Sequence, residues 1–184
     1  MRSIKIKRRE SLKMNLKTIL VTGGNAGIGF ALCRQLLCDH GCKVLLASRS
    51  EVKGSQAVET LKEAHPDLAS NIELVHMDVS SDASVSAAAE SLQGITLYAL
   101  VNNAGIGFNT DPNSKDGLLN TNFLGPKRVT EAFLEKIDPE NGRIVNVSSG
   151  AASMWLRNQS KKHKTLFSNP GSFDELNTAV EQLK

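Results

Sequence analysis

Short apolar runs alternate with longer segments of helical periodicity along most of the chain, and this alternation constrains the fold more than any other feature. The runs are rich in Val, Ile and Leu, as in strands that are buried on both faces of a sheet. Parallel strands need long crossover connections, which are usually helices. We therefore predict an α/β fold with a doubly wound parallel sheet of about five strands. The expected strands are 18–21, 43–47, 71–77, 96–101 and 143–147, and the expected helices are 27–40, 51–65, 82–92 and 115–136.

The alternation stops after Ser149. Residues 150–170 are polar and basic and end in a turn signal, so they are predicted to form a loop. Ser172 and Glu175 have the spacing of a capping box, which predicts a terminal helix from this point. No sixth strand is expected, so the apolar residues of strand 143–147 would lie at an uncovered sheet edge.

Charge and cysteine content limit the classes of protein that need to be considered. The net charge of +3 is uneven, because residues 1–17 hold seven Lys or Arg and one Glu, whereas the rest of the chain holds 15 basic and 18 acidic residues. A mildly acidic body does not favour nucleic-acid binding. Residues 1–16 are expected to be a disordered basic extension, and an organelle-targeting role for them stays open. Apolar runs are too short for a membrane helix, so no membrane contact is expected.

Three cysteines, Cys33, Cys38 and Cys42, lie within ten positions. Their odd number does not suit a secreted disulfide framework, which favours a reducing compartment and a cytoplasmic location. Their spacing suits no tetrahedral metal site, so no metal is expected and the three residues are interpreted as small buried hydrophobic side chains.

A glycine-rich segment lies between the first expected strand and the first expected helix, with the sequence Thr22-Gly23-Gly24-Asn25-Ala26-Gly27-Ile28-Gly29. Such a turn is tight, lets the backbone approach a pyrophosphate, and lets the helix pack closely on the strand. The helix N-terminus then presents free N–H groups to phosphate oxygens. The position predicts a Rossmann-type dinucleotide site. The residues expected to contact the dinucleotide in this turn are Gly23, Asn25, Gly27, Ile28 and Gly29.

The end of the second expected strand indicates which dinucleotide binds. An acidic residue there would hydrogen-bond a ribose 2′-hydroxyl, but this chain has Ser48-Arg49. A hydroxyl and a guanidinium suit a 2′-phosphate, so NADP(H) is predicted in preference to NAD(H).

The chain from about Leu16 to Ser149 resembles the short-chain dehydrogenase/reductase family. It carries five family signatures in order, each at an expected element boundary. They are the T-G-x-x-x-G-x-G turn, Asp78-Val79 after the third strand, Asn102-Asn103-Ala104-Gly105 after the fourth, Thr121–Gly125 in the following helix, and Gly142–Ser149 at the fifth strand. The Gly-Gly-Asn turn, Ser-Arg and the long segment after Ser149 look most like the NADPH-dependent carbonyl reductases of that family.

The resemblance implies a function as well as a fold. It implies that Asp78, Val79, Asn103, Ala104 and Gly105 contact the cofactor. It also implies that the family's active-site asparagine and serine are Asn122 and Ser149, and that a small carbonyl compound (a ketone, aldehyde or quinone) is reduced by hydride transfer. A hydroxyl at Ser149 would position the substrate oxygen and stabilise its developing negative charge.

One essential part of the family pattern is missing. The family's acid/base is a tyrosine followed four residues later by a lysine, but the only tyrosine here is Tyr98, before the Asn-Asn-Ala-Gly segment. Tyr98 is interpreted as a packing residue. Two alternatives follow. The chain is the N-terminal part of a longer reductase, with a dinucleotide-binding domain at 17–149 and the start of an interrupted substrate region at 150–184. Otherwise it is a non-catalytic dinucleotide-binding module or a partner of an intact reductase. The oligomeric state and the identity of the substrate are not indicated.

Overall fold

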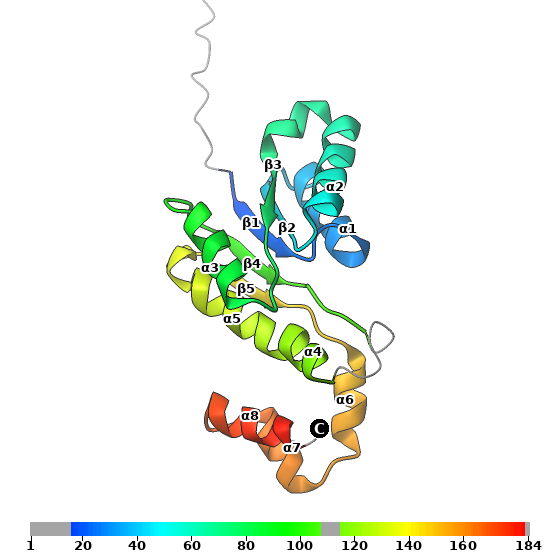
Figure 1. Cartoon of the computed structure of the whole chain (residues 1–184), viewed down its shortest axis with the longest axis vertical. Helices are drawn as coiled ribbons and strands as arrows, with labels where there is room; N and C mark the ends of the chain where they lie inside the picture. Colours follow the sequence, from blue (N-terminus) through cyan, green and yellow to red (C-terminus); the bar gives the residue numbers. More distant parts are fainter. Residues whose placement is uncertain (1–15, 108–114, 183–184) are drawn as a thin grey trace, which may run out of the picture.

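The structure, a computed structural model, describes residues 16–107 and 115–182; residues 1–15 of the expected basic extension lie outside this range. Five strands form one sheet in the order β3-β2-β1-β4-β5, and every neighbouring pair is parallel (Figure 1). The order reverses between β1 and β4, as in a doubly wound sheet, so the predicted fold class is confirmed. The strands are β1 (Thr18–Thr22), β2 (Lys43–Ser48), β3 (Ile72–His76), β4 (Ala99–Asn102) and β5 (Arg143–Asn146).

Helices cover both faces of the central strands, which is why these strands are apolar throughout. Side chains alternate between the faces of a strand. On β1, Val21 packs in one cluster with Leu37 and Leu61, whereas its neighbour Leu20 packs in another with Val85 and Phe133. The first cluster is covered by α1 (Gly27–Cys38) and α2 (Glu51–Ala64), and the second by α3 (Asp82–Ser91) and α5 (Gly125–Phe133). A short 3₁₀ helix, η1 (Pro66–Asn71), joins α2 to β3.

The segment predicted as one helix over 115–136 is divided into four parts. An α-helix, α4 (Lys115–Leu119), runs into a π-helical turn, η3 (Asn120–Leu124), then into α5, and a 3₁₀ turn, η4 (Leu134–Lys136), ends the segment. Pro126 stands at the start of α5 and has no N–H to donate to the preceding turn, which interrupts the α-helical hydrogen-bond ladder there.

The prediction of a loop over 150–170 is wrong. Two helices occupy most of it, α6 (Gly150–Arg157) and α7 (Lys161–Ser168). Their N-termini are capped by Ser149 and Ser160, whose hydroxyls accept hydrogen bonds from Ala151 and His163 amides. The lysines of α7 and the turn signal after it favoured a loop, and neither helix contains a buried residue. The predicted terminal helix is confirmed as α8 (Phe173–Glu181), with Ser172 as its N-cap.

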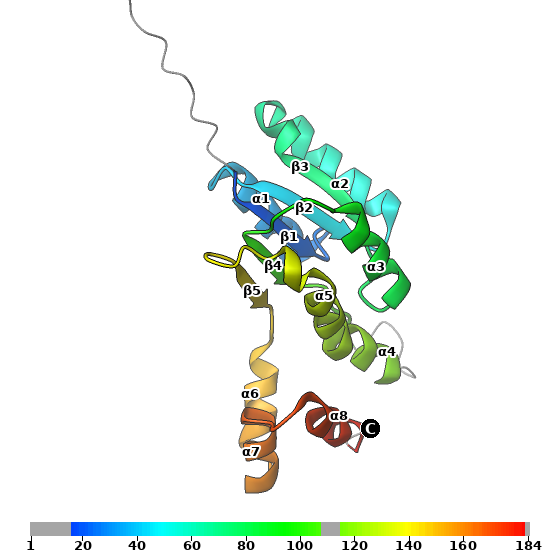
Figure 2. The ribbon, with the colours of Figure 1, turned by 90° about the vertical axis from the view of Figure 1, so that its left-hand side faces the viewer.

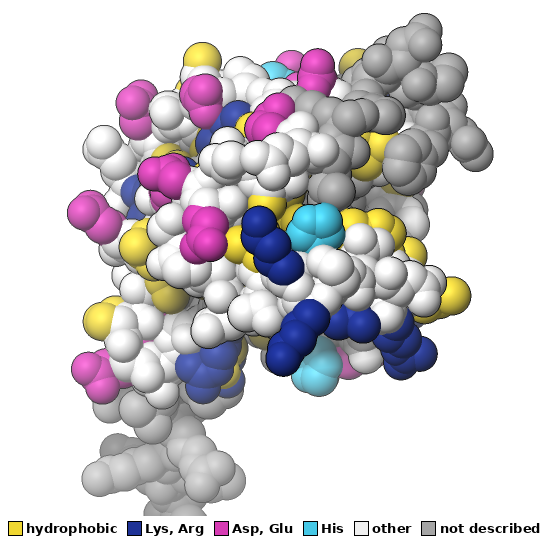
Figure 3. All heavy atoms as spheres, turned by 90° about the horizontal axis from the view of Figure 1, so that it is seen from below, with side chains coloured by type: hydrophobic (Ala, Val, Ile, Leu, Met, Phe, Trp, Pro, Cys, Tyr) yellow, Lys and Arg dark blue, Asp and Glu magenta, His cyan; other side chains and the backbone are white. Residues whose placement is uncertain are grey.

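The C-terminal helices project from one end of the sheet domain (Figure 2). An edge contact between Trp155 and Phe167, with ring centroids 5.3 Å apart, joins α6 to α7. Phe173 of α8 stacks on Phe123 of the π-turn, with a centroid distance of 5.5 Å. Lys and Arg side chains gather on the end of the molecule seen in Figure 3. The sequence of α7 contains three lysines, Lys161, Lys162 and Lys164.

Strand β5 forms the edge of the sheet and is exposed along its whole length. The side chains of Ile144, Val145 and Val147 are 38%, 46% and 44% exposed. The expected uncovered apolar edge is therefore confirmed. Within the described ranges the chain forms no further strand after β5, and none of its helices is long and apolar enough to cross a membrane.

The three cysteines are free thiols, and two of them behave as the predicted small hydrophobic residues. Cys33 and Cys42 are buried in the cluster between the sheet and α1, while Cys38 is half-buried. Burial raises the pKa of the Cys33 thiol to about 12, so this thiol stays protonated and unreactive.

Candidate functional site

An open cavity of about 450 Å³ lies at the carboxyl ends of the strands, next to the point where the strand order reverses. Four loops form it, and each of them follows one of the strands β1 to β4. The structure brings all twelve residues predicted to bind the dinucleotide to this one cavity. They are Gly23, Asn25, Gly27, Ile28, Gly29, Ser48, Arg49, Asp78, Val79, Asn103, Ala104 and Gly105.

The glycine-rich turn between β1 and α1 needs its glycines for two different reasons. Gly23 and Gly27 have φ angles of +65° and +53°, which side chains strongly disfavour. Gly29 instead lies where the first turn of α1 meets the preceding backbone, and a Cβ there would be 2.3 Å from the Gly23 carbonyl oxygen. Ile28, expected to contact the dinucleotide, is 72% exposed and lines the cavity.

The N-terminus of α1 differs from those of most other helices. Serines cap α2, α3, α6, α7 and α8, but Ala26 precedes α1 and provides no side-chain cap. The N–H groups at the start of α1 thus face the cavity side of the turn without a side-chain acceptor. An uncapped helix N-terminus carries partial positive charge and free donors, a suitable arrangement for a phosphate.

Thr22 and Asn103 join the glycine turn to the loop after β4. The buried hydroxyl of Thr22 accepts hydrogen bonds from the backbone N–H groups of Asn103 and Ala104, both at 2.9 Å. The amide of Asn103 donates in return to the carbonyl oxygens of Thr22 and Gly23, at 2.9 and 3.3 Å. These bonds fix two walls of the cavity relative to each other.

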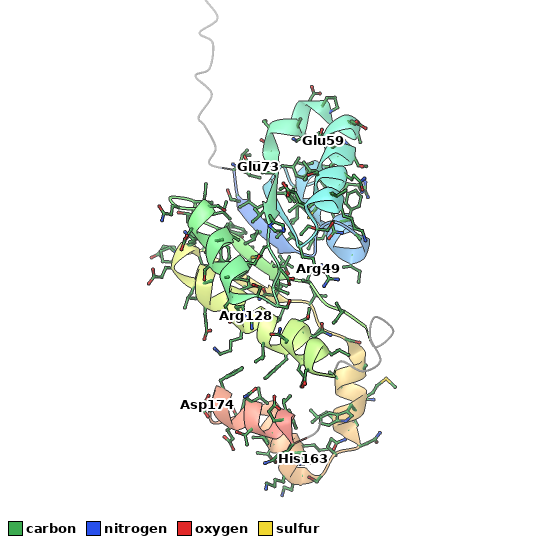
Figure 4. The ribbon with its side chains drawn as sticks, viewed as in Figure 1. Arg49, Glu59, Glu73, Arg128, His163 and Asp174 are labelled. Atoms are coloured by element: carbon green, nitrogen blue, oxygen red, sulfur yellow. The ribbon has the colours of Figure 1, made fainter. Side chains whose placement is uncertain are left out.

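The loop after β2 places two cations at the cavity. Arg49, labelled in Figure 4, and Lys53 of the first turn of α2 are both exposed and line it. Ser48 also lines the cavity, but its hydroxyl donates to the Ser50 carbonyl oxygen at 2.9 Å and its side chain is buried. The hydroxyl of Ser48 is thus engaged within its own loop, and the positive charge of this wall comes from Arg49 and Lys53.

Asp78 and Val79 form the wall that follows β3. The Asp78 carboxylate accepts hydrogen bonds from the amide and hydroxyl of Ser80, at 2.9 and 2.7 Å. Partial burial opposes ionisation of Asp78, but these hydrogen bonds and the positive charges of Arg49 and Arg128 outweigh it and hold the pKa below its usual value. The cavity therefore also carries a negative charge, close enough to Arg49 to be stabilised by it.

The two predicted active-site residues lie outside the cavity lining. Asn122, in the π-turn, binds Ile106 with both halves of its amide, since its Oδ1 accepts from the Ile106 N–H at 2.9 Å and its Nδ2 donates to the Ile106 carbonyl at 2.8 Å. Ile106 does line the cavity. Ser149 is exposed and caps α6 through its Oγ.

Tyr98 lies at the opposite end of the sheet, just before β4. Its ring packs on the cluster beneath α1, with Lys17 Nζ 4.2 Å from the ring centroid. Its backbone bonds to Thr18 and Arg143, at the amino ends of β1 and β5. Tyr98 is a packing residue, as predicted.

Six residues that line the cavity were not predicted from the sequence. Lys53 could have been predicted, because it lies only four residues after Arg49, in the first turn of the expected helix. Two of the others lie inside the family signatures at the glycine-rich turn and at Thr121–Gly125, and the remaining three lie outside the signatures. The six are Ala26, Ser50, Lys53, Met77, Ile106 and Thr121. In the described part of the chain, no three His, Cys, Asp or Glu side chains come together as a metal site would require.

Comparison with known proteins relates this site to a family. The model of the short chain dehydrogenase family matches residues 17–161. The chain is 37% identical to (+)-neomenthol dehydrogenase of Arabidopsis thaliana, over 73% of this chain and 54% of that protein. It is 35% identical to carbonyl reductase (NADPH) 1 of Mus musculus, over 76% of this chain and 51% of that protein. It thus spans about half the length of these relatives.

A solved structure extends the similarity to the C-terminal helices. The menthone neomenthol reductase from Mentha piperita superimposes with a TM-score of 0.79 at 28% identity, covering 91% of this chain and 72% of that one. The match therefore extends beyond the five-stranded sheet.

Proposed function

Because the chain belongs to the short-chain dehydrogenase/reductase family, we propose that it binds NADP(H), in preference to NAD(H), in the cavity at the strand ends. The residues present fit a dinucleotide. The uncapped N-terminus of α1 suits the pyrophosphate, and the missing side chain at Gly29 lets the helix approach the turn. The proposed contacts are the twelve predicted residues that lie at the cavity, together with Lys53.

The observation that carries the preference for NADP(H) is the pair of cations after β2. A 2′-phosphate bears negative charge, and Arg49 can bind it through charge-assisted hydrogen bonds while Lys53 adds a second positive charge. The similarity to a carbonyl reductase whose name includes NADPH supports the same preference.

The proposed family reaction is reduction of a small carbonyl compound, and the bound nicotinamide would supply the hydride. Ser149 would orient the substrate oxygen through its hydroxyl, and Asn122 would hold Ile106 and the loop after β4 in place. The sequence has no Tyr-x-x-x-Lys pair, and its one tyrosine lies at the wrong end of the sheet. We therefore propose that the 184-residue chain binds cofactor without turning over substrate.

We favour the interpretation that this chain is the N-terminal part of a longer reductase. The apolar side chains along β5 are exposed, and the match covers only 54% and 51% of the two relatives. Both observations support a further segment packed beside β5. A non-catalytic module or a partner of an intact reductase remains the alternative. The free thiols support a cytoplasmic location.

Fluorescence titration with NADPH and NADH tests the binding proposal. The wild-type chain should bind NADPH more tightly, and Arg49→Glu should abolish or reverse that preference. Arg34→Glu makes the same charge change on α1, outside the cavity, and should leave the preference intact. Equal affinities of the wild-type chain for the two cofactors would contradict the role of Arg49.

A turnover assay tests the proposed lack of an acid/base. The purified chain, saturated with NADPH, should oxidise no cofactor when a ketone, aldehyde or quinone is added. Turnover that depends on the chain would overturn this proposal. A transcript that continues past Lys184 and encodes Tyr-x-x-x-Lys would decide between the longer reductase and the complete, non-catalytic module.

A further inference from the structure

Arg128 of α5 binds three acceptors on two neighbouring segments. Its Nη1 donates to the carbonyl oxygen of Val79 at 2.7 Å, its Nε pairs with the Asp82 carboxylate, and its Nη2 donates to Asn120 Oδ1 at 3.0 Å. The Arg128 side chain is only 16% exposed. Val79 belongs to the cavity wall, whereas Arg128, labelled in Figure 4, does not line the cavity, so its guanidinium binds the backbone of that wall from outside the cavity.

Asn120 adds a second connection from the same side. Its Nδ2 donates to the carbonyl oxygen of Ser80 at 3.0 Å, and its Oδ1 accepts the hydrogen bond from Arg128 Nη2. Ser80 in turn donates twice to the Asp78 carboxylate. A chain of hydrogen bonds therefore runs from Arg128 through Asn120 and Ser80 to Asp78, while Arg128 binds Val79 directly.

The π-turn also holds the opposite wall. Two positions after Asn120, Asn122 binds the backbone of Ile106 in the loop after β4. One turn of helix thus fixes two cavity walls through separate side chains. Close packing supports this arrangement, since a Cβ on Gly125 would lie 3.1 Å from Val79 Cγ2.

From these contacts we infer that Arg128 is a positioning residue, which with Asn120 fixes the Asp78–Val79 wall and thereby sets the affinity for the adenosine half of the cofactor. The inference rests on the proposed dinucleotide function. Arg128 does not line the cavity, so it acts through the backbone of Val79 and Ser80. Its planar guanidinium can bind several acceptors at once, which a lysine ammonium cannot do in the same geometry.

The test compares Arg128→Met, Arg128→Lys and Asn120→Ala with the wild-type chain. Dissociation constants are measured for NADPH and for 2′,5′-ADP, which carries only the adenosine half. Arg128→Met should weaken both ligands by about the same factor, on the order of tenfold, because one charged hydrogen-bond network is lost. Asn120→Ala should weaken both several-fold. The ratio of NADPH to NADH affinity should not change, since Arg49 is intact.

Lys127→Met is the matched control. It removes a positive charge from the adjacent position, where Lys127 pairs with Glu131 and lies over Phe173 and does not contact the wall. This variant should bind NADPH as the wild type does. Arg128→Lys keeps the positive charge and should still weaken NADPH binding several-fold. If this variant bound NADPH with wild-type affinity, the effect of Arg128 would come from its charge alone and the inference that it positions the wall would be overturned.

Hydrogen exchange gives a readout that does not depend on the cofactor. Exchange at residues 78–81 should accelerate in Arg128→Met, at a temperature well below its Tm, while the central strands stay protected. A variant that lost only global stability would show a lower Tm with unchanged dissociation constants and unchanged local exchange, which would overturn the inference alone. Absence of any dinucleotide binding by the wild-type chain would overturn the proposed function and the inference together.

Discussion

A Cβ atom on Gly29 would lie 2.3 Å from the carbonyl oxygen of Gly23 and 2.5 Å from the Asn103 amide nitrogen. The first turn of α1 thus packs directly on the turn that leaves β1. This contact occurs at the proposed pyrophosphate site, so the packing of the helix and the shape of the site depend on the same missing side chain.

Gly29→Ala should therefore lose dinucleotide binding and destabilise the fold. The added methyl meets backbone that cannot move independently, which costs about 1–3 kcal/mol. Chemical denaturation and NADPH titration measure the two effects. Gly94→Ala is the control for a glycine outside the cavity, because Gly94, unlike Gly29, has a positive φ (74°) and open space around it. It should lose some stability and keep its affinity.

Thr22→Val should destabilise the chain although the two side chains have similar shapes. The Thr22 hydroxyl accepts from two backbone N–H groups, of Asn103 and Ala104, in a buried position. Valine would leave both donors unpaired, at a cost of about 2–4 kcal/mol in the free energy of unfolding. Urea denaturation measures this loss. Thr22→Ser keeps the hydroxyl and should recover most of the stability; an equal loss in both variants would contradict the argument.

Lys53→Met should reduce the preference for NADPH less than Arg49→Glu does. Both side chains line the cavity, but the methionine variant removes one charge whereas the glutamate variant reverses one. The ratio of NADH to NADPH dissociation constants is the relevant measurement. Lys62→Met, further along α2 and paired with Glu59, serves as the control and should leave that ratio unchanged. Identical ratios for Lys53→Met and the wild type would show that Lys53 does not contribute to the preference for NADPH.

Asp78 should make the stability of the chain depend on pH in acid. Its pKa is lowered in the folded state, so its ionised form stabilises the fold above its unfolded pKa of about 3.9, and this contribution is lost as the pH falls through the folded value. Asp78→Asn should be less stable than the wild type at pH 7. The difference in unfolding free energy should shrink below about pH 4. A difference that stays constant down to pH 3 would show that ionisation of Asp78 does not matter.

The central sheet was predictable from the sequence because local and long-range signals agree there. Strands such as β1 and β2 are buried on both faces, so their apolar runs end close to the real strand ends. Seven of the twelve cavity residues, those after β1 and β2, were predictable for a related reason, since parallel strands bring their carboxyl ends to one edge of the sheet. The other five, after β3 and β4, were expected from the resemblance to the short-chain dehydrogenase/reductase family.

The parts that could not be predicted depend on contacts between distant residues or lie outside the buried core. Helices α6 and α7 contain no buried residue, and the serines at 149 and 160 are the N-caps that could have marked their starts. The role of Arg128 depends on contacts with Val79 and Asp82, more than forty positions away. No local pattern reports such contacts.

A row of valine side chains crosses the sheet from β1 through β4 to the edge strand β5. Val21, Val101 and Val145 lie in register on neighbouring strands, and their exposure rises from 0% to 6% to 46%. The isolated chain should therefore self-associate through β5, where unpaired backbone adjoins exposed apolar side chains. Val145→Lys should reduce this association in light scattering and change the unfolding free energy by no more than about 0.5 kcal/mol. Val101→Lys, one strand inward, should unfold the chain. A large loss of stability in Val145→Lys would mean that this face is covered in the isolated chain.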